Sequence, residues 1–408
     1  MKRKCLILFL VSFFCFLFPV YAVDLEIHSK NALLYNLDED TVLYEKNPDE
    51  KIAIASLTKL MTAVVAVENI SSLDEKVKLT TKDFEGLIEA NASVAGFSVG
   101  QNPTYRDLLY GLLLPSGADA ALALARNVAG SRDNFVKMMN AKAKELGLVN
   151  THFVNETGLD AEEHYSTLKE VAILFKYALK NPELNKILKK DTYTMSDGSF
   201  TVRSSISKNR TRYNLDMDYI LGGKTGTTDN AGLCLASIAS KNGTNYMLIT
   251  ARAPYDKKAP YNFYDAKTIY EYFMENYETK TLVEKGDILL TLNTKYAKEE
   301  TIQFHAKEEI KKYVPIPYDK KDVTYTFDGV DTISYKTKVG TKLGVLEVKY
   351  KDMVVEKRDI ILEEPLHLDR MKYIKAHFLW IMGSIIFILL VFFTKRKCRR
   401  KGRRKYKK

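Results

Sequence analysis

At its most informative point the chain reads Ala55-Ser56-Leu57-Thr58-Lys59-Leu60-Met61-Thr62, the start of a helix predicted over residues 56–69. Positions i and i+3 share one face of a helix, so the Lys59 amine can reach the Ser56 hydroxyl. A serine hydroxyl is a weak nucleophile until a base takes its proton, and a lysine is such a base only where burial keeps it neutral. Because this spacing is common in proteins, its meaning depends on the motifs that accompany it.

Two further motifs follow along the chain. Ser116-Gly117-Ala118 precedes a predicted helix, and Lys224-Thr225-Gly226-Thr227 ends a predicted strand. The second motif offers an ammonium and hydroxyls that suit a substrate carboxylate, and Gly226 leaves room for a peptide beside the strand. The exposed N–H groups at the start of the Ser56 helix favour a developing oxyanion. The three motifs together predict a serine nucleophile that faces a carboxylate-binding strand.

The surrounding sequence outlines two domains. Up to about residue 278 we predict a hairpin, then helices, then strands and a closing helix, so that one sheet is built from both ends and covered by helices. The predicted elements are a hairpin at 30–46, helices at about 105–114, 118–129, 133–146, 167–180 and 262–277, and strands at 219–224, 234–240 and 246–251. Beyond residue 280, short β-like runs at 283–291, 301–304, 323–326, 332–336 and 343–350 predict a small all-β domain.

With its three motifs in this order, the sequence resembles the D-alanyl-D-alanine carboxypeptidases, which are low-molecular-mass penicillin-binding proteins. The resemblance runs from about Leu33 to Tyr277 and includes Gly158-Leu159-Asp160 and His164-Tyr165-Ser166-Thr167. It implies a β-lactamase/transpeptidase-like fold of the α/β (α+β) class, with an antiparallel sheet covered by helices. It also implies a following small all-β domain and a C-terminal membrane attachment, here a transmembrane helix.

The resemblance implies a serine-type D-Ala-D-Ala carboxypeptidase that acts on peptidoglycan stem peptides. Ser56 attacks the carbonyl between the two terminal D-alanines and forms an acyl-enzyme. Lys59 accepts the proton of Ser56, and Ser116 passes a proton to the leaving D-alanine. Water then hydrolyses the acyl-enzyme, and β-lactam antibiotics are expected to acylate the same serine as covalent inhibitors. No metal and no cofactor is implied.

The resemblance assigns substrate binding to Lys224, Thr225, Gly226 and Thr227. Lys224 supports the proton relay, the two threonines hold the terminal carboxylate, and the glycine lets the substrate approach. The backbone N–H groups of Ser56 and Thr227 form the oxyanion hole. The resemblance leaves open whether the third stem-peptide residue is lysine or diaminopimelate. It also leaves open whether the enzyme trims pentapeptides, cuts cross-links, or does both.

Position 118 departs from the family pattern. The second motif of the family is Ser-x-Asn, whereas this chain has Ala118. Loss of one active-site donor can cost about 10²–10³ in rate. The alternative to an active peptidase is therefore a catalytically weakened or inactive penicillin-binding wall protein. A β-lactamase or an esterase on the same fold is a further alternative.

Several other residues are candidates for a functional role. Pro182-Glu183-Leu184-Asn185 is similar to the loop that carries the deacylating glutamate of class A β-lactamases. It lies 66 residues after Ser116 and 39 before Lys224, close to the reverse of the spacing in that class. We interpret it as a turn that starts a helix. His164 is expected to support a loop near the site. Arg210 and Arg212 are either substrate-orienting or ordinary surface charges.

Both ends of the chain have the pattern of targeting or membrane-anchoring segments. A positive start at residues 2–4, an apolar run from Leu6 to Val20 and a small residue at Ala22 predict a secretory signal peptide. Residues 376–394 reach the ~20 apolar residues that a helix needs to cross ~30 Å of hydrocarbon. The basic segment behind them is expected to stay in the cytoplasm.

These features divide the chain into six predicted segments. They are a signal peptide over 1–22, a serine peptidase catalytic domain over 23–278, a small all-β domain over 279–363, a stalk over 364–375, a transmembrane helix over 376–394 and a basic cytoplasmic tail over 395–408. The expected location is the bacterial cell membrane, with a single-pass anchor and an extracellular catalytic domain.

The formal net charge of +11 comes from the two ends of the chain. Eleven Lys and Arg residues lie in 395–408 and three at 2–4, so the part between carries a charge of about −3. This distribution argues against nucleic acid as a partner, whereas the tail is expected to meet anionic membrane lipid. The exported part holds one cysteine, Cys234, so no disulfide framework is predicted. We interpret Cys234 as a small core residue.

Overall fold

The structure, a computed structural model, describes residues 23–256 and 258–405. The signal peptide predicted over residues 1–22 lies outside the described residues. The chain divides into two compact units, Met1–Glu278 and Thr279–Lys408. We refer to them as the N-terminal unit and the C-terminal unit.

The N-terminal unit is built on a five-stranded sheet with the strand order β2-β1-β7-β6-β5. These strands are β1 (Asn31–Asn36), β2 (Thr41–Lys46), β5 (Ile220–Thr228), β6 (Gly232–Lys241) and β7 (Thr244–Ala253). All neighbouring pairs are antiparallel, and the first hairpin joins the sheet through β1, which pairs with β7 from Asn31 opposite Ala251. The prediction of one antiparallel sheet made from both ends of this unit is confirmed.

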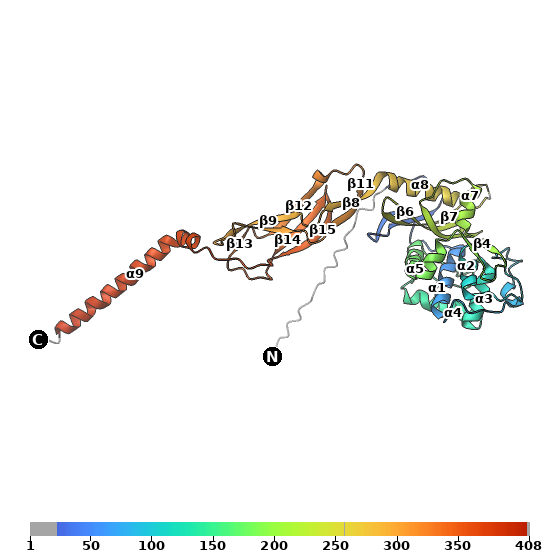
Figure 1. Ribbon diagram of the computed structural model, residues 1–408, viewed down its shortest axis with the longest axis horizontal. Coiled ribbons are helices and arrows are strands. Elements are labelled where there is room, and N and C mark those ends of the chain that lie inside the picture. Colours follow the sequence, from blue (N-terminus) through green and yellow to red (C-terminus); the bar gives the residue numbers. More distant parts are fainter. Residues whose placement is uncertain (1–22, 257, 406–408) are drawn as a thin grey trace, which may run out of the picture. The chain divides into compact units, whose positions relative to one another are not determined.

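Helices cover both faces of this sheet. They are α1 (Lys59–Asn69), α2 (Tyr105–Leu113), α3 (Ala118–Ala129), α4 (Arg132–Glu145), α5 (Leu168–Lys180), α6 (Pro182–Leu188), α7 (Ser205–Arg212) and α8 (Tyr261–Asn276). Figure 1 shows α1 to α5 on one side of the strands, with α7 and α8 on the other. The helix α1 is buried along most of its length and lies at the centre of the largest hydrophobic core.

The helix caps agree in part with the sequence. Thr167 caps α5 at the start of the helix predicted over 167–180, because its side chain accepts a hydrogen bond from the Glu170 N–H. The reciprocal bond of a capping box is not formed, since the Glu170 carboxylate accepts from Asn150 N–H at 2.8 Å and from Thr151 Oγ1 at 2.5 Å. Glu170 therefore ties α5 to the preceding loop instead of completing a capping box.

One α-helix and two strands of this unit were not predicted. They are α7 and the short strands β3 (Thr192–Thr194) and β4 (Thr201–Arg203). The helix α7 has the polar sequence SISKNRTR, which lacks the apolar periodicity that signals a helix. The strand β5 also continues to Thr228, so Lys224-Thr225-Gly226-Thr227 lies inside a strand and not at its end.

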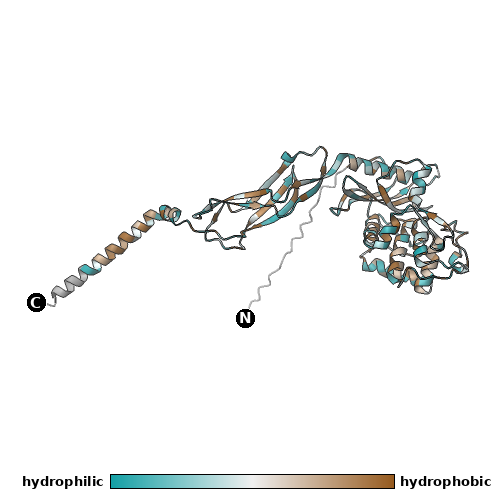
Figure 2. Cartoon of the chain, viewed as in Figure 1, coloured by the Kyte–Doolittle hydropathy of each residue, from teal (hydrophilic) through white to brown (hydrophobic). Residues whose placement is uncertain are grey.

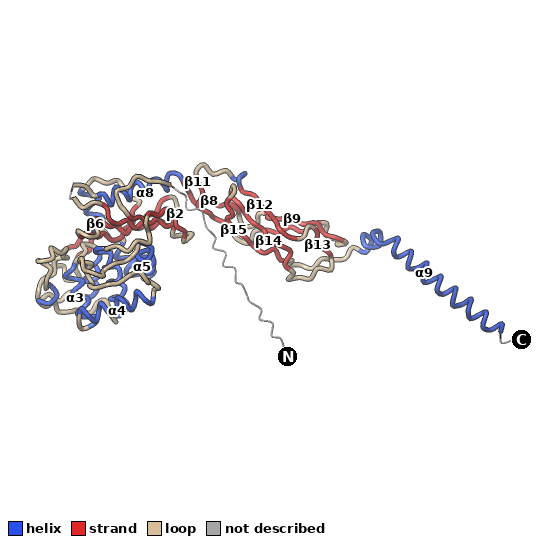
Figure 3. The backbone as a smooth tube through the Cα atoms, turned by 180° about the vertical axis from the view of Figure 1, so that it is seen from behind, coloured by secondary structure: helices blue, strands red, loops and turns tan. Residues whose placement is uncertain are grey.

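The C-terminal unit begins with three small sheets, of strand orders β10-β9-β13, β11-β8 and β12-β14-β15. The strands are β8 (Tyr277–Val283), β9 (Ile288–Lys295), β10 (Thr301–His305), β11 (Ile310–Pro315), β12 (Val323–Gly329), β13 (Thr332–Ser334), β14 (Lys342–Tyr350) and β15 (Met353–Ile361). Figure 3 shows this region as strands and loops. The strand predicted at 283–291 is wrong, because Glu284 and Asp287 form a turn that separates β8 from β9. The strands β11 and β15 were not predicted.

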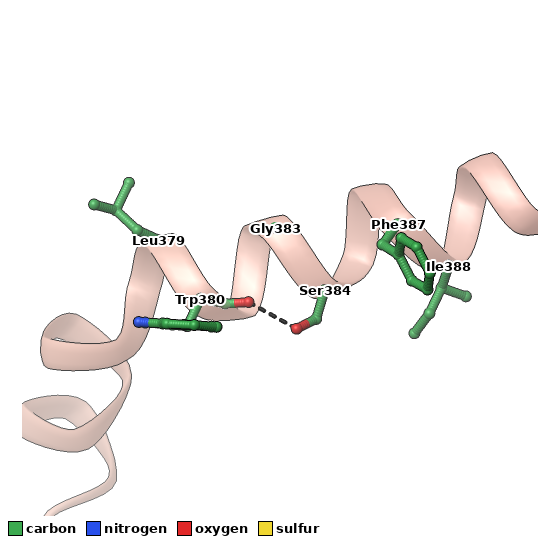
Figure 4. Close-up of a pocket in the computed structure, with 6 residues that line it drawn as sticks. All are labelled: Leu379, Trp380, Gly383, Ser384, Phe387 and Ile388. Carbon is green, nitrogen blue, oxygen red and sulfur yellow. Dashed lines mark hydrogen bonds between the residues drawn. The ribbon is translucent and has the colours of Figure 1, made fainter.

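The chain ends in one long helix, α9 (Arg370–Lys405). Among the described residues it is the one helix long and apolar enough to cross a membrane. Figure 2 shows its apolar stretch, and Figure 4 shows Leu379, Trp380, Phe387 and Ile388 projecting from it around a shallow hollow at Gly383.

The helix α9 starts inside the segment predicted as a stalk. Asp369 begins it by accepting from the N–H groups of Met371 and Lys372, at 2.9 and 3.0 Å. Such a cap satisfies N–H groups that have no partner within the helix. The apolar pattern alone does not include this polar first turn, which explains the difference from the predicted boundary at residue 376.

Candidate active site

The Ser56 and Lys59 side chains lie together at the start of the central helix. Residues Ala55–Thr58 form a 3-10 turn that leads directly into α1. In a 3-10 turn, side chains at i and i+3 are eclipsed, which brings these two groups close. Lys59 Nζ lies 3.0 Å from Ser56 Oγ, with Lys59 2% exposed and Ser56 half-buried. The predicted nucleophile and base are therefore within hydrogen-bond distance.

Burial prepares Lys59 to act as a base. Removal from water lowers the pKa of the Lys59 amine to about 7, although the carboxylates of Asp119 and Glu156 oppose the shift. The same nitrogen donates a 2.6 Å hydrogen bond to the carbonyl oxygen of Thr157, which fixes its position. A lysine with this pKa is partly neutral near pH 7, as proton abstraction from Ser56 requires.

Ser116 occupies a tight turn before α3. Its backbone has φ +71°, in the left-handed region, and its buried Oγ has no hydrogen-bond partner among the described residues. A Cβ on Gly117 would lie 2.6 Å from Asp119 Oδ1, so this position requires glycine. A buried hydroxyl without a partner is available to bind a substrate group.

Asp119 holds the segment that covers this turn. Its carboxylate accepts from the N–H groups of Ala95, Gly96 and Phe97, at 2.8 to 3.2 Å. The residue is 1% exposed. Asp119 is therefore a positioning residue at the start of α3 and is not placed to exchange protons with a substrate.

The side chain at position 118 lies in an apolar environment. Ala118 is 1% exposed and packs with Leu87 and Leu122. Its N–H donates to the carbonyl oxygen of Ser93 at 2.7 Å. This side chain supplies no hydrogen bond to the site.

The strand β5 passes next to the start of the Ser56 helix. A Cβ on Gly226 would lie 3.1 Å from both the Ser56 nitrogen and Ala55 Cβ. Lys224 is fully buried, and both burial and the charge of Lys59 lower its pKa well below the usual value. Thr227 is exposed at this edge of the strand. The strand therefore brings the third motif against the first.

The helix α7 connects the second and third motifs. Its first residue, Ser205, donates its N–H to the carbonyl oxygen of Leu114 at 2.9 Å, two residues before Ser116. The Ser205 hydroxyl accepts a 2.6 Å hydrogen bond from Thr225 Oγ1. Sequence reasoning missed Ser205, because neither a motif nor an apolar pattern marks it.

The loop at residues 154–164 packs against the turn that carries Ser56. Gly158 has φ +79°, and a Cβ there would lie 2.0 Å from the Ala55 carbonyl oxygen. His164 accepts from the Val154 N–H through Nδ1 at 3.1 Å, so its Nε2–H donates to Thr58 Oγ1 at 2.8 Å. Burial lowers the pKa of His164 to about 4, so it is neutral and acts as a support.

The same loop contacts the end of β5. Asp160 accepts from Thr228 Oγ1 at 2.7 Å and from the Asn230 N–H at 3.1 Å. The loop therefore connects the nucleophile turn to the strand that carries the third motif. Sequence reasoning missed Thr157, whose carbonyl oxygen accepts from Lys59, because a backbone contact leaves no signal in the residue type.

Other candidates have structural roles. Asn181 caps α6 by accepting from the Glu183 N–H, and the Glu183 carboxylate pairs with Arg106 at 2.9 Å. The predicted helix start is confirmed, and Glu183 is occupied by this ion pair. Cys234 is buried in β6, where burial raises the pKa of its thiol to about 12. Among the described residues no group of three His, Cys, Asp or Glu side chains is arranged to hold a metal ion.

A cavity of about 330 Å³ borders the end of the third motif. Its lining includes Thr225 and Thr227 from β5, and Arg212 and Tyr213 from the end of α7. Of the two arginines weighed from the sequence, Arg212 thus lies at the cavity. Arg210 instead pairs with Asp218.

Comparison with known proteins agrees with this arrangement. The sequence model of the family described as D-alanyl-D-alanine carboxypeptidase matches residues 19–254. The carboxypeptidase DacF of Bacillus subtilis is 31% identical over 84% of this chain and 87% of its own length. The carboxypeptidase DacC of Escherichia coli is 29% identical over 86% of this chain and 90% of its own length.

Solved structures share the fold. Penicillin binding protein 5 of Haemophilus influenzae covers 85% of this chain and 99% of its own, with a TM-score of 0.63 and 22% identity. The DD-transpeptidase of Streptomyces K15 covers 61% of this chain and 98% of its own, with a TM-score of 0.55 and 30% identity. The mixed α/β fold with an antiparallel sheet and a small all-β domain is confirmed.

Proposed function

This chain belongs to the D-alanyl-D-alanine carboxypeptidase family, and we propose that it removes the terminal D-alanine from peptidoglycan stem peptides as a serine peptidase. The observation that carries the mechanism is the 3.0 Å contact between Ser56 Oγ and Lys59 Nζ, together with the lowered pKa of that amine. A hydroxyl beside a partly neutral, buried amine is an activated nucleophile.

Acylation begins when Ser56 attacks the carbonyl carbon of the penultimate D-alanine. Lys59 takes the hydroxyl proton as the new C–O bond forms. The backbone N–H groups of Ser56 and Thr227 bind the developing oxyanion, since Gly226 holds β5 against the serine turn. Collapse of this intermediate breaks the C–N bond and leaves an ester on Ser56.

The leaving D-alanine needs a proton on its nitrogen. We assign its delivery to the unpartnered Ser116 hydroxyl, which passes on the proton that Lys59 took from Ser56 and so leaves Lys59 neutral again. Lys224 is buried close enough to be influenced by the charge of Lys59. Water then attacks the ester by the same route in reverse, and Lys59 accepts its proton. The products are the shortened peptide and free D-alanine.

Substrate binding falls to β5. We assign the terminal carboxylate to the hydroxyls of Thr225 and Thr227, next to the buried Lys224, whose amine donates a 2.6 Å hydrogen bond to the Thr225 carbonyl oxygen. Gly226 leaves space for the peptide backbone. β-Lactam antibiotics place a reactive amide and a carboxylate at similar separation, so we expect them to acylate Ser56 and remain bound.

The alternatives are less well supported. A β-lactamase is not favoured, because the Glu183 carboxylate, the candidate for deacylation at that segment, forms an ion pair with Arg106. The weakened or inactive wall-binding protein has one supporting observation, the apolar surroundings of Ala118. An intact Ser56–Lys59 pair argues for catalysis.

We also propose a location and orientation. The helix α9 would anchor the protein in the bacterial cell membrane as a single span, and the basic residues 395–408 would stay in the cytoplasm near anionic lipid headgroups. The N-terminal unit would then lie outside the cell, where its peptidoglycan substrate is found.

The test is direct. The full chain in detergent is incubated with fluorescent penicillin, and D-alanine release from a peptide ending in D-Ala-D-Ala is measured alongside. We expect both labelling and release, and we expect Ser56→Ala to lose both. Labelling without release would favour the inactive wall-binding protein, and a β-lactam turnover assay would expose a β-lactamase.

A further inference from the structure

Four aromatic rings join the β strands of the C-terminal unit to the start of α9. The centre of the Tyr296 ring lies 5.4 Å from that of Tyr373 and 5.1 Å from that of His377. The Tyr335 ring lies 6.1 Å from the Tyr373 ring, and Tyr373 stacks on His377 at 4.2 Å. The two tyrosines outside α9 follow the ends of β9 and β13, so the loops at this end of the unit pack against the helix.

Hydrogen bonds also fix the chain that leads into α9. The Asp369 N–H donates to the carbonyl oxygen of Tyr296 at 2.9 Å, and the Lys298 N–H donates to that of His367 at 2.8 Å. The His367 ring nitrogen Nδ1 lies 2.8 Å from a carboxylate oxygen of Glu299. The segment predicted as a stalk is therefore bound to the loop after β9.

The charge-free part of α9 is short for a membrane span. Residues 378–394 rise over only ~26 Å at about 1.5 Å each, whereas the hydrocarbon layer is ~30 Å thick. Such a mismatch draws the flanking residues toward the lipid headgroups. His377, which contacts Tyr296, directly precedes this part, and Trp380, a residue typical of the membrane interface, projects from the following turn (Figure 4). The loop that carries Tyr296 therefore lies within about one helical turn (~5.4 Å) of the hydrocarbon, inside a headgroup layer about 5–7 Å thick.

The same end of the unit carries an excess of positive charge. Six Lys and Arg side chains outnumber three acidic ones, counted over residues 295–300, 334–336 and 367–376. The three acidic side chains already have partners within the chain. These pairs are Glu299 with His367, Asp369 with the first turn of α9, and Glu300 with Lys372.

The other cations of this end are exposed, and no carboxylate in the described part of the chain forms an ion pair with them. They are Lys295, Lys298, Lys336, Arg370 and Lys375. Lys295 Nζ lies 5.3 Å from the centre of the Tyr296 ring, and Lys336 Nζ lies 5.7 Å from that of Tyr335. Tyrosine is enriched at the level of the lipid headgroups, and lysine beside a bilayer is attracted to anionic lipid.

We propose that this end of the β strands rests on the membrane surface, with Tyr296 and Tyr335 among the headgroups and Lys295, Lys298 and Lys336 bound to the phosphates of anionic phospholipids. The inference rests on the proposed anchoring by α9 and does not depend on the catalytic activity. It makes the β strands of the C-terminal unit a base that lies on the bilayer, held there by lipid contacts in addition to the helix.

The test measures how fast individual lysines react in the full chain. The protein is placed in nanodiscs of phosphatidylcholine alone or of phosphatidylcholine mixed with phosphatidylglycerol, and treated with a neutral acetylating reagent. Peptide mass spectrometry then gives a rate for each lysine. Lys295, Lys298 and Lys336 should react about three- to fivefold more slowly in the anionic discs, as expected for amines held by phosphate. High salt should remove the difference, because it screens exposed charges.

Lysines at the other end of β9 provide the control. Lys285 and Lys321 are exposed, and Lys285 lies in the turn before β9, about 20 Å or more from Lys295 at ~3.3 Å per strand residue. Their rates should be equal in the two kinds of disc.

Two double variants test whether the charges act together. Lys295→Gln with Lys336→Gln should reduce the protection of Lys298 in anionic discs, because fewer cations hold the loops on the lipid. Lys285→Gln with Lys321→Gln removes the same charge and should leave that protection unchanged. Inorganic phosphate added to the phosphatidylcholine discs should protect none of these lysines, which separates a lipid surface from free phosphate.

The outcomes separate this inference from the proposed function. Equal rates for Lys295, Lys298 and Lys336 in the two kinds of disc would overturn it, and so would protection that persists at high salt, because burial and not phosphate would then shield the amines. A chain that does not enter the discs would refute the anchor and this inference together. Fluorescent penicillin added to the same discs tests Ser56 separately, so a failure of the peptidase proposal leaves the lysine rates as they are.

Discussion

The amine of Lys59 shows how burial changes the chemistry of one side chain. In water a lysine amine is protonated at neutral pH and cannot accept a proton. Here burial lowers its pKa to about 7, while Asp119 and Glu156 keep the shift from going further. Lys224 is also fully buried, and both burial and the charge of Lys59 lower its pKa well below the usual value.

This pKa predicts the pH dependence of acylation. Because the lowered pKa leaves the amine neutral above about pH 7, the rate of penicillin labelling should rise with pH and level off above that value. Stopped labelling reactions between pH 5 and 9 would measure it. A rate that does not change over this range would argue against Lys59 as the base.

The substitution Ala118→Asn tests the departure from the family motif. We expect D-alanine release to rise, because the amide restores a donor to the site, and the free energy of unfolding to fall by about 1–3 kcal/mol, because a polar group enters the contact with Leu87 and Leu122. Steady-state release and urea unfolding measure the two effects. Unchanged release would mean that another group already performs the task of the missing amide.

The turns that hold the site depend on glycine at positions where backbone segments touch. Gly158 has a left-handed backbone, and its missing side chain is what allows the loop to lie against the carbonyl of Ala55. The support that this loop gives to the Ser56 turn therefore depends on the absence of a Cβ. Such contacts form only when the loop packs against the turn, and neither segment forms them alone.

The prediction for Gly158→Ala has a matched control in Gly147→Ala. Both positions have positive φ, +79° and +75°, so each alanine should cost about 1–2 kcal/mol of backbone strain. Only at Gly158 does the new Cβ meet another atom, at 2.0 Å from the Ala55 oxygen. We expect a larger loss of stability there and slower labelling of Ser56, as seen by thermal unfolding and fluorescent penicillin. Equal effects in both variants would contradict this.

Over the whole chain, the two units have different bases for their stability. The N-terminal unit encloses a large core around α1, whereas the C-terminal unit has a smaller core that includes Leu282, Val314, Leu346 and Tyr350. The helix α9 lies beyond that core, and the apolar window that qualifies it as a membrane span is 0% buried in protein. A long apolar helix without protein contacts is stable in a bilayer, because its backbone hydrogen bonds are made within the helix and its apolar side chains contact lipid chains.

The proposed orientation predicts the reactivity of two cysteines. Cys398 lies in the basic tail, so a membrane-impermeant maleimide should label it only after cells are permeabilised. Cys234 should stay unlabelled in both cases, because it is fully buried and burial raises the pKa of its thiol to about 12. A Cys398→Ser variant is the control for signal from that site. Labelling of Cys398 in intact cells would reverse the orientation.

Motif spacing and apolar periodicity in the sequence predict the residues of the candidate site and most of the elements that carry them. Local spacing explains this success: Ser56 and Lys59 are neighbours on one turn, and apolar periodicity marks α3 and the strands of the main sheet. The same logic failed where the pattern is polar, as in α7, or where a charged turn interrupts two short strands, as at Glu284–Asp287.

Which side chains face one another depends on contacts between segments that are distant in the sequence. The sequence could not distinguish Arg210 from Arg212, because the ion pair with Asp218 and the opening to the cavity depend on how α7 lies beside β5. It could not show that Thr157 offers its carbonyl to Lys59, since every residue has one. Covalent neighbours set spacing, whereas contacts between distant segments arise from packing, and it is packing that sets the pKa of the base.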